Sequence, residues 1–287
     1  MTWKRVATAL VLIPVVVGLV LFTPTWAVAV ATAVITVLAL WEYFALGEAI
    51  GHRAYRVWTI FCSLLFIYFQ WLFAYNNRAS DRLYFLFGWP LGERPSLDWY
   101  LFLFVLGLAM LILWTKRPLV EALPAVGISS SAILLVAFPL SYAVALHGLA
   151  RVGPKLLLFA LVITWAGDSA AYFVGRAMGK HPLAPHISPK KTWEGSVGSM
   201  VGSLLVAWAF SYWIRIPIGH LLAMAVIGNV AGQMGDLLES AYKRSAGVKD
   251  SGGLLPGHGG VLDRIDALIL CIPVIWYYVV LVNPVMN

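Results

Sequence analysis

Long apolar runs separated by short polar connections make up most of this chain. A helix needs about 20 apolar residues to cross the hydrocarbon core of a bilayer, and runs near that length recur throughout. They predict nine transmembrane helices, at residues 6–22, 27–46, 57–75, 98–114, 127–146, 156–176, 195–213, 216–237 and 262–282. The apolar segment 83–91 is too short to span and is predicted to be a loop or an interfacial piece. The pattern therefore predicts an all-α integral membrane protein.

The composition supports this prediction. Of the 287 residues, 61% are hydrophobic and 11% are charged, and the mean hydropathy is +0.84, whereas a soluble domain carries about 25% charged residues. The formal net charge is +7. In a membrane protein, excess Lys and Arg sets topology and meets anionic head groups, so we expect no nucleic-acid partner. Cys62 and Cys271 lie inside apolar runs and are predicted to be buried thiols, not a disulfide or metal ligands.

The positions of Lys and Arg predict which loops face the cytoplasm. With the N-terminus inside, nine crossings place fourteen of the twenty Lys and Arg inside and only six outside, namely Arg78, Arg82, Arg94, Arg151, Lys155 and Arg215. This bias agrees with the positive-inside rule. It places the two polar loops 177–194 and 238–261 on the cytoplasmic side, where one site can draw on both.

The polar residues divide the chain into two predicted regions. Residues 1–150 are expected to form a transmembrane scaffold, and residues 151–287 to form the catalytic region, with its active site at the cytoplasmic ends of the helices. The compact chain, without a long polar N-terminal extension, leads us to expect a bacterial inner membrane as its location.

Two carboxylates are predicted to lie within spans. Glu42 is near the end of the second span, and Asp168 is about two turns inside the sixth. An ionisable residue at membrane depth is a functional candidate. For Glu42 we favour a place in the head-group region or a pairing with a nearby cation. For Asp168 an ion pair with a neighbouring helix, a metal and a water-filled cleft all remain open.

The loop 177–194 is basic, with Lys180, Lys190 and Lys191. Ser188-Pro189 is typical of a helix start, and the free N–H groups of a helix N-terminus beside lysines would form an anion site. A simple positive-inside loop is the alternative. The GxxxG spacing of Gly198–Gly202 that follows indicates close helix packing.

Acidic pairs stand at the ends of two predicted spans. Asp236 and Glu239 are three residues apart, as are Asp263 and Asp266, so each pair shares a helix face. A solvated face is a poor explanation, because both pairs enter apolar spans. Carboxylates with substrate phosphates and water suit Mg²⁺, and the sequence therefore predicts a magnesium site.

A glycine-rich connection, GVKDSGGLLPGHGG, joins these two spans. Glycines let backbone N–H groups approach phosphate oxygens, and Lys243, Arg244 and Lys249 add positive charge. His258 could contact a phosphate, transfer a proton or stabilise the loop. Metal binding by His258 is not favoured, because no nearby His or Cys completes such a site.

These segments resemble the signature of the phosphatidate cytidylyltransferases, also called CDP-diacylglycerol synthases. The resemblance covers about residues 160–270 and includes the stretches WAGDSAAYFVGR, SPKKTWEG and GQMGDLLES. Tyr242 stands where the family pattern has an aliphatic residue or Phe. The ordered motif itself is Ser240-x-x-Lys243-Arg244, then Lys249-Asp250-x-Gly252, then Leu255-Pro256-x-His258-Gly259-Gly260-x-x-Asp263-Arg264-x-Asp266.

The resemblance implies that CTP and phosphatidic acid are converted to CDP-diacylglycerol and pyrophosphate with Mg²⁺ and a second metal ion. It implies metal ligands at Asp236, Asp263, Asp266 and Asp168. It implies catalytic roles for Asp263, Asp266, Lys243 and Asp250. It implies substrate binding by Lys190, Lys191, Lys243, Arg244, Lys249, His258, Gly259, Gly260 and Arg264. Catalysis would act through charge neutralisation and positioning, and family precedent with the glycine-rich faces makes a homodimer plausible.

Two other classes of function stay open at this point. A related CTP-using membrane enzyme, such as a polyprenol kinase or an archaeal-type CDP-lipid synthase, would share part of the motif. An ion-coupled transporter could use Asp168, Asp236 and Asp263 as an ion pathway. Transporters, however, place such sites near the bilayer midplane between repeats, and no repeat is visible here.

Overall fold

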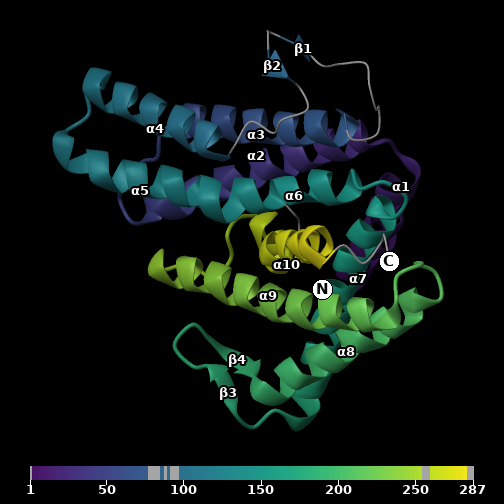
Figure 1. The fold of residues 1–287 in the computed structure, drawn as a ribbon. Coiled ribbons are helices and arrows are strands. Elements are labelled where there is room, and N and C mark those ends of the chain that lie inside the picture. Colours follow the sequence, from purple (N-terminus) through teal and green to yellow (C-terminus); the bar gives the residue numbers. More distant parts are fainter. Residues whose placement is uncertain (1, 77–84, 87–88, 91–96, 254–258, 283–287) are drawn as a thin grey trace.

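The computed structural model describes residues 2–76, 85–86, 89–90, 97–253 and 259–282, and within these ranges it is a bundle of helices (Figure 1). Each predicted span coincides with a helical segment of the described chain. These segments are α1 (Thr2–Phe22), α2 (Thr25–Ala49), α3 (Arg56–Asn76), α4 (Leu97–Trp114), the composite run Leu119–His147, α7 (Gly153–Met178), α8 (Trp193–Ser211), α9 (Ile218–Ser245) and α10 (Leu262–Val282).

Six of the described helices are long and apolar enough to cross a membrane: α2, α3, the composite run, α7, α9 and α10. The described apolar parts of α1 and α4, Leu12–Phe22 and Trp99–Trp114, are shorter. The 19-residue α8 begins with a run of glycines and serines, which lowers its hydropathy. The fold is therefore that of an all-α membrane protein with six helices of spanning length and character, and the remaining three spans stay predictions.

The composite run contains a π-helical segment. It consists of the 3₁₀ turn η1 (Leu119–Glu121), α5 (Ala122–Ala132), the π segment η2 (Ile133–Ala137) and α6 (Phe138–His147). Pro139 lies in the first turn of α6 and cannot donate to the carbonyl of Leu135 as an α-helix requires. The local change of hydrogen-bond spacing follows from this missing donor.

Small residues allow the helices of the second half to pack closely. A Cβ at Gly198 would lie 2.7 Å from the side chain of Val174, and one at Gly202 would lie 3.1 Å from the carbonyl oxygen of Ala166. The GxxxG pair thus packs α8 against α7, as predicted. Gly228 packs in the same way against Cys271 of α10. Helix α10 is consequently held between α9 and α6 in the middle of the molecule (Figure 1).

The basic loop after α7 differs from the prediction. Ser188-Pro189 does not start a helix; it belongs to strand β4 (Ser188–Thr192), which pairs antiparallel with β3 (Pro182–Ala184). Proline disfavours the helical conformation in the residue before it, which explains the extended backbone here. Helix α8 starts only at Trp193, where the Thr192 hydroxyl accepts from Gly195 N at 3.1 Å.

The second polar loop is shorter than predicted. The sequence analysis placed a loop at 238–261, but α9 continues to Ser245 because its last turns consist of helix-forming residues. The helix ends beside Gly247, whose φ of +70° a residue with a side chain rarely adopts. Of the predicted segment 83–91, the strands β1 (Phe85–Leu86) and β2 (Trp89–Pro90) are described, and its other residues lie outside the described residues.

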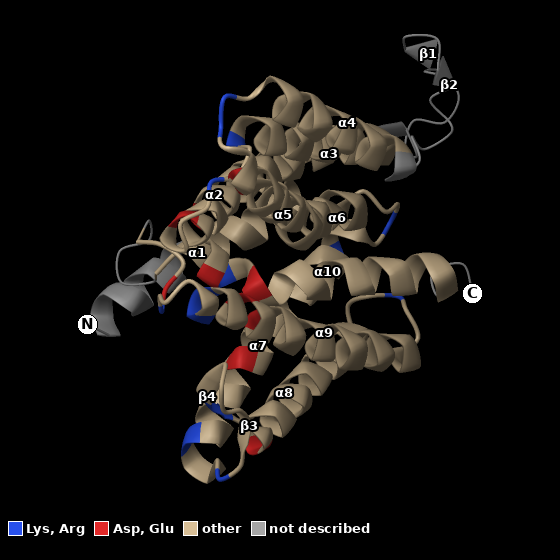
Figure 2. Ribbon diagram, turned by 90° about the vertical axis from the view of Figure 1, so that its left-hand side faces the viewer, with Lys and Arg blue, Asp and Glu red and all other residues tan. Residues whose placement is uncertain are grey.

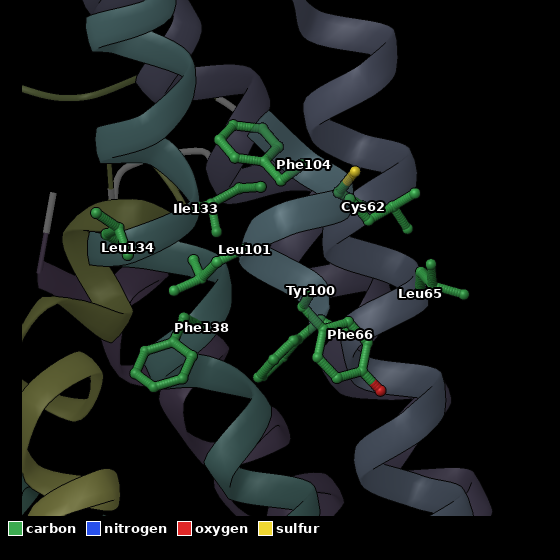
Figure 3. A pocket seen from close by; sticks show the side chains of 10 residues that line it. Cys62, Leu65, Phe66, Tyr100, Leu101, Phe104, Ile133, Leu134 and Phe138 are labelled. Carbon is green, nitrogen blue, oxygen red and sulfur yellow. The ribbon is translucent and has the colours of Figure 1, made fainter. Parts of the chain in front are cut away.

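An apolar cavity of about 80 Å³ lies between α3, α4 and the composite run (Figure 3). Figure 3 shows Phe66, Tyr100 and Phe138 around it, together with Cys62. None of the described residues that line it is charged, so they offer no charge to a phosphate. Cys62 and Cys271 are both free and buried, as predicted.

Candidate active site

Charged residues from four segments far apart in the sequence meet near the middle of the molecule. The segments are α7, strand β4, α9 and the start of α10 (Figure 2). In Figure 2 the acidic positions of α7, α9 and α10 lie close to one another, with basic positions beside them. The residues that the sequence analysis selected therefore come together largely through packing of the second half.

Lys243 is the centre of one ion-paired group. Its ammonium nitrogen lies 2.5 Å from Glu239 Oε2, one turn earlier on α9, and 2.5 Å from Asp263 Oδ1 on α10. Lys243 is 8% exposed and Glu239 is 4% exposed. A buried cation is tolerated only with such compensation. The Glu239 to Lys243 spacing is the i,i+4 spacing that brings the two side chains together on a helix.

Asp263 also organises the glycine-rich loop. Its Oδ2 accepts hydrogen bonds from Ser251 N at 3.0 Å, from Ser251 Oγ at 3.1 Å and from Gly260 N at 2.8 Å. Gly259 adopts a φ of +77°, and a Cβ there would lie 2.8 Å from this same oxygen. Both carboxylate oxygens of Asp263 are thus engaged, one with Lys243 and one with the loop. This geometry suits positioning of the loop and Lys243 better than direct metal ligation.

Glu42 belongs to the same network, although it lies in the first half of the chain. It is 3% exposed, and its carboxylate accepts from Ser251 Oγ at 2.9 Å, from Val261 N at 2.9 Å and from Leu262 N at 2.8 Å. The first N–H groups of a helix have no partner within the helix, and a carboxylate there is favoured by the helix dipole. Among the described residues Glu42 therefore pairs with backbone and hydroxyl donors and not with a cation, which corrects one of the two favoured interpretations, while a head-group position stays a prediction. Glu42 caps α10 and holds the loop.

Two glycines of the loop are needed to let Glu42 approach. A Cβ at Gly252 would lie 2.7 Å from the Glu42 carboxyl carbon, and a Cβ at Gly260 would lie at the same distance. The Gly260 Cβ would also overlap the Ser251 hydroxyl. Glycine is thus required here for close approach of a buried carboxylate, in addition to its expected role of exposing N–H groups.

A second ion pair joins the hairpin to α9. Lys191 of β4 pairs with Asp236, and both side chains are between one quarter and one third exposed. Asp168 on α7 lies close enough to interact electrostatically with Asp236, which repels it, and with Lys191 and Arg264, which attract it. Among the described residues Asp168 forms no direct ion pair, and the cations of β4 and α10 offset its burial only in part, so a metal and a water-filled cleft stay open as its partner. Lys190, the neighbour of Lys191, is exposed.

Asp266 and the carboxylates near it, Asp236, Glu239 and Asp168, form an acidic cluster that suits a hard cation. Asp266 is half-buried, interacts repulsively with Asp236, Glu239 and Asp168, and accepts a hydrogen bond from Ala267 N at 2.7 Å on one oxygen. The buried Glu239 Oε1 has no hydrogen-bond partner. Converging carboxylate oxygens of this kind fit Mg²⁺ by their chemistry. Within the described residues no three acidic, His or Cys side chains are close enough to hold a metal by themselves, but Mg²⁺ commonly uses only one or two protein carboxylates with substrate phosphates and water.

The remaining predicted residues surround this centre or lie outside the described chain. Arg244 is exposed and donates to the carbonyl oxygens of Val248 at 3.1 Å and Ile187 at 3.4 Å, so it ties the loop to the hairpin. Lys249 and Asp250 are exposed on the loop. His258 lies outside the described residues.

Glu194 anchors the hairpin that carries Lys190 and Lys191. Its carboxylate accepts from the backbone N–H groups of Lys180 at 3.1 Å and His181 at 3.3 Å, and His181 Nδ1 lies 2.6 Å from it. The His181 hydrogen bond, with the backbone hydrogen bonds, lowers the pKa of Glu194 to about 2.

Sequence reasoning missed a polar network that joins α8 and α9. Asn229 donates to the hydroxyls of Ser199 and Ser203, each at 2.8 Å, and its own oxygen accepts from Gln233 at 2.6 Å. Asn229 and Gln233 are polar residues in a predicted span, four apart and followed by Asp236. That spacing was a usable signal, because buried amides in a membrane helix require partners.

The comparisons with known proteins identify the family of this chain. The family model described as "Cytidylyltransferase family" matches residues 3–282. A phosphatidate cytidylyltransferase of Haemophilus influenzae is 34% identical over 297 residues, covering 96% of this chain and 97% of the relative. One of Bacillus subtilis is 39% identical over 178 residues, covering 60% of this chain and 66% of the relative. One of Staphylococcus saprophyticus is 46% identical over 125 residues, covering 43% and 48%.

The first of these relatives and the family model both extend well beyond the segments 160–270 that carry the motif. The first half, including Glu42, is therefore part of the match and not a separate attachment. This chain belongs to the cytidylyltransferase family.

Proposed function

We propose that this protein is a phosphatidate cytidylyltransferase, which makes CDP-diacylglycerol and pyrophosphate from CTP and phosphatidic acid. A phosphate oxygen of the lipid attacks the α-phosphorus of CTP. The new P–O bond forms as the bond from the α-phosphorus to the bridging oxygen breaks, and pyrophosphate leaves with that electron pair. The observation that carries the proposal is the convergence of Lys191, Asp236, Lys243, Asp263 and Asp266 at one place, in a chain that matches such an enzyme over almost its whole length.

Bringing a lipid phosphate to a triphosphate joins two anions, so the site must offset negative charge and hold geometry. Lys191 and Lys243 are each held against a carboxylate. Incoming phosphates would compete for these ammonium groups, with Lys190, Arg244, Lys249 and Arg264 supplying further charge around them. Phosphatidate is ionised at neutral pH, so no general base is required.

The carboxylates Asp236 and Asp266, with Asp168 beside them, would hold a divalent metal, for which Mg²⁺ is the proposed ion. When bound there, the metal would neutralise charge on the triphosphate. Asp263 would keep Lys243 and the loop in place. Asp250 and the glycine N–H groups of Gly259 and Gly260 remain candidates for substrate contact.

The location follows from the same charge distribution. The site is proposed to face the cytoplasm of a bacterial inner membrane, where CTP is available and the lipid substrate enters from the bilayer. A homodimer is proposed through the apolar outer face of α8, on which Val197, Val201, Leu205, Trp208 and Tyr212 are each more than half exposed.

The test uses purified protein in mixed micelles with phosphatidic acid, Mg²⁺ and CTP labelled at either the α- or the γ-phosphate. We expect the α label to enter the lipid and the γ label to leave as pyrophosphate. In a parallel reaction with a polyprenol in place of phosphatidic acid, transfer of the γ label to the polyprenol would identify a kinase instead. Absence of any labelled lipid across detergents and metals would overturn the proposal.

A further inference from the structure

A cavity of about 720 Å³ opens at the end of α2, between the start of α3 and the end of α4. Ligand pockets typically measure about 300–1,000 Å³. It is lined by residues of the first half, from Glu48 to Phe61 with Leu111 and Arg117. Of the site residues that the structure describes, none lines it.

The polar wall of this cavity is positively charged. It carries Arg53, Arg56 and Arg117 against the single carboxylate of Glu48. Arg56 lies 2.6 Å from Glu48 and is neutralised by it, and its guanidinium also stacks on Trp41 at 5.2 Å. The charge of Arg53 is only weakly offset, because its side chain is 75% exposed and lies 3.9 Å from Glu48.

Arg117 is held beside Arg53. Its Nη1 donates to the carbonyl oxygen of Arg53 at 3.0 Å, and its guanidinium lies 5.1 Å from the centre of the Tyr55 ring. These contacts use one face and one nitrogen of the guanidinium, which has five donors in all. Arg53 and Arg117 thus meet at one edge of the cavity through the backbone carbonyl of Arg53, and both add positive charge to its wall.

The other wall is apolar and open to the surroundings. Phe61 is 52% exposed and Leu111 is 37% exposed, and both lie on helices of the apolar bundle. A pocket with cations at one edge and exposed apolar side chains at the other matches an amphiphile better than a soluble anion. The arginines belong to loops predicted to face the cytoplasm, where the leaflet is rich in anionic lipid.

We propose that this cavity binds the head group of an anionic phospholipid. The lipid phosphate lies between Arg53 and Arg117, and an acyl chain runs along Phe61 and Leu111. The site is separate from the proposed catalytic centre. It is connected to it by α2, since Glu48 follows Glu42 by six residues, about 9 Å along the helix axis.

Native mass spectrometry of the detergent-purified protein tests the proposal with phosphatidylglycerol, which is anionic but is not phosphatidate, and with zwitterionic phosphatidylcholine. We expect the wild type to retain phosphatidylglycerol in preference to phosphatidylcholine. The double variant Arg53→Gln/Arg117→Gln should bind it about tenfold more weakly, because two charge-assisted phosphate contacts are lost. Phosphatidylcholine binding should not change.

The matched control is Arg151→Gln/Arg215→Gln, which removes the same charge from loops predicted to face the other side. It should bind phosphatidylglycerol like the wild type. Equal loss in both double variants, equal retention in all three proteins, or no preference for the anionic lipid would overturn the proposal. If the double variant does not fold, Arg53→Gln alone provides the test, because the Arg53 side chain is 75% exposed and its ion pair with Glu48 is long, at 3.9 Å. A failure of catalysis would leave this readout unaffected.

Discussion

Asp263 and Glu42 hold the same loop from opposite sides. Ser251 lies between them, with its hydroxyl 2.9 Å from Glu42 and 3.1 Å from Asp263. The backbone N–H of Gly260 donates to Asp263, and those of Val261 and Leu262 donate to Glu42. The start of α10 and the loop before it therefore depend on two buried or half-buried carboxylates that receive donors at every oxygen.

Asp263→Asn should nearly abolish turnover. The amide removes the charge that Lys243 pairs with and places an N–H₂ donor where the loop requires an acceptor. Loss of such a positioned charged group lowers kcat by about 10²-fold or more. Turnover of labelled CTP is measured alongside thermal unfolding in detergent. Full activity with intact folding would remove Asp263 from the site.

Glu42→Gln tests whether the first half positions the catalytic loop. In the variant, the amide NH₂ of the glutamine would face a backbone N–H, so one hydrogen bond would be lost. A hydrogen bond to a charged acceptor contributes about 1.5–3 kcal/mol to the stability of the fold. We expect a lower melting temperature and a fall in kcat with a smaller change in the KM for phosphatidate. Glu48→Gln, on the same helix but facing Arg56, is the control. Equal effects of the two substitutions would contradict a specific role for Glu42.

At the scale of elements, the β3–β4 hairpin differs from the prediction of a helix start at Ser188-Pro189, just as the end of α9 differs from the predicted loop. Extended backbone places Lys191 against Asp236, and the exposed Lys190 beside it. The hairpin is attached to α8 by Glu194, whose carboxylate takes the backbone donors of Lys180 and His181. A helix N-terminus is not required to place these cations.

Glu194→Ala should loosen the hairpin without removing either partner of the ion pair between Lys191 and Asp236. We expect the KM for CTP to rise several-fold and kcat to fall less. A looser hairpin would weaken the binding of CTP by Lys190 and Lys191 about equally in the ground state and in the transition state. His186→Ala, an exposed change at the turn of the same hairpin, should leave both constants near wild-type values. Unchanged kinetics in the Glu194 variant would show that the hairpin is held by other contacts.

At the scale of the whole molecule, charge is distributed unevenly along the helix axes. Figure 2 shows most basic and acidic segments toward the side where the N-terminus lies, and few toward the end of α10. The contact of Lys155 with the carbonyl oxygen of Trp213 at 3.1 Å places two of the predicted outside loops together. The hydrogen bond from Arg117 to the carbonyl oxygen of Arg53 likewise places two of the predicted inside loops together.

Single-cysteine labelling in oriented vesicles checks this topology. His186→Cys should react with a membrane-impermeant maleimide only from the cytoplasmic side, and Arg215→Cys only from the other. Both native thiols are buried, at 8% and 0% exposure, so the wild-type chain serves as the unlabelled control. Labelling of both variants from the same side would contradict the predicted crossing of the membrane by α8.

Hydropathy and motif spacing were sufficient to predict the helices, the buried cysteines and the close helix packing at Gly198 and Gly202. Each of these depends on residues close together in the sequence, where periodicity and composition determine the local structure. Only the tertiary structure revealed that Glu42 accepts a hydrogen bond from Ser251, 209 residues away, and that Lys191 forms an ion pair with Asp236. It also revealed the arginine-lined cavity at the end of α2. The hydrogen-bond partners of a buried carboxylate are the donors that tertiary packing places next to it. No local sequence pattern specifies which distant N–H groups these donors will be.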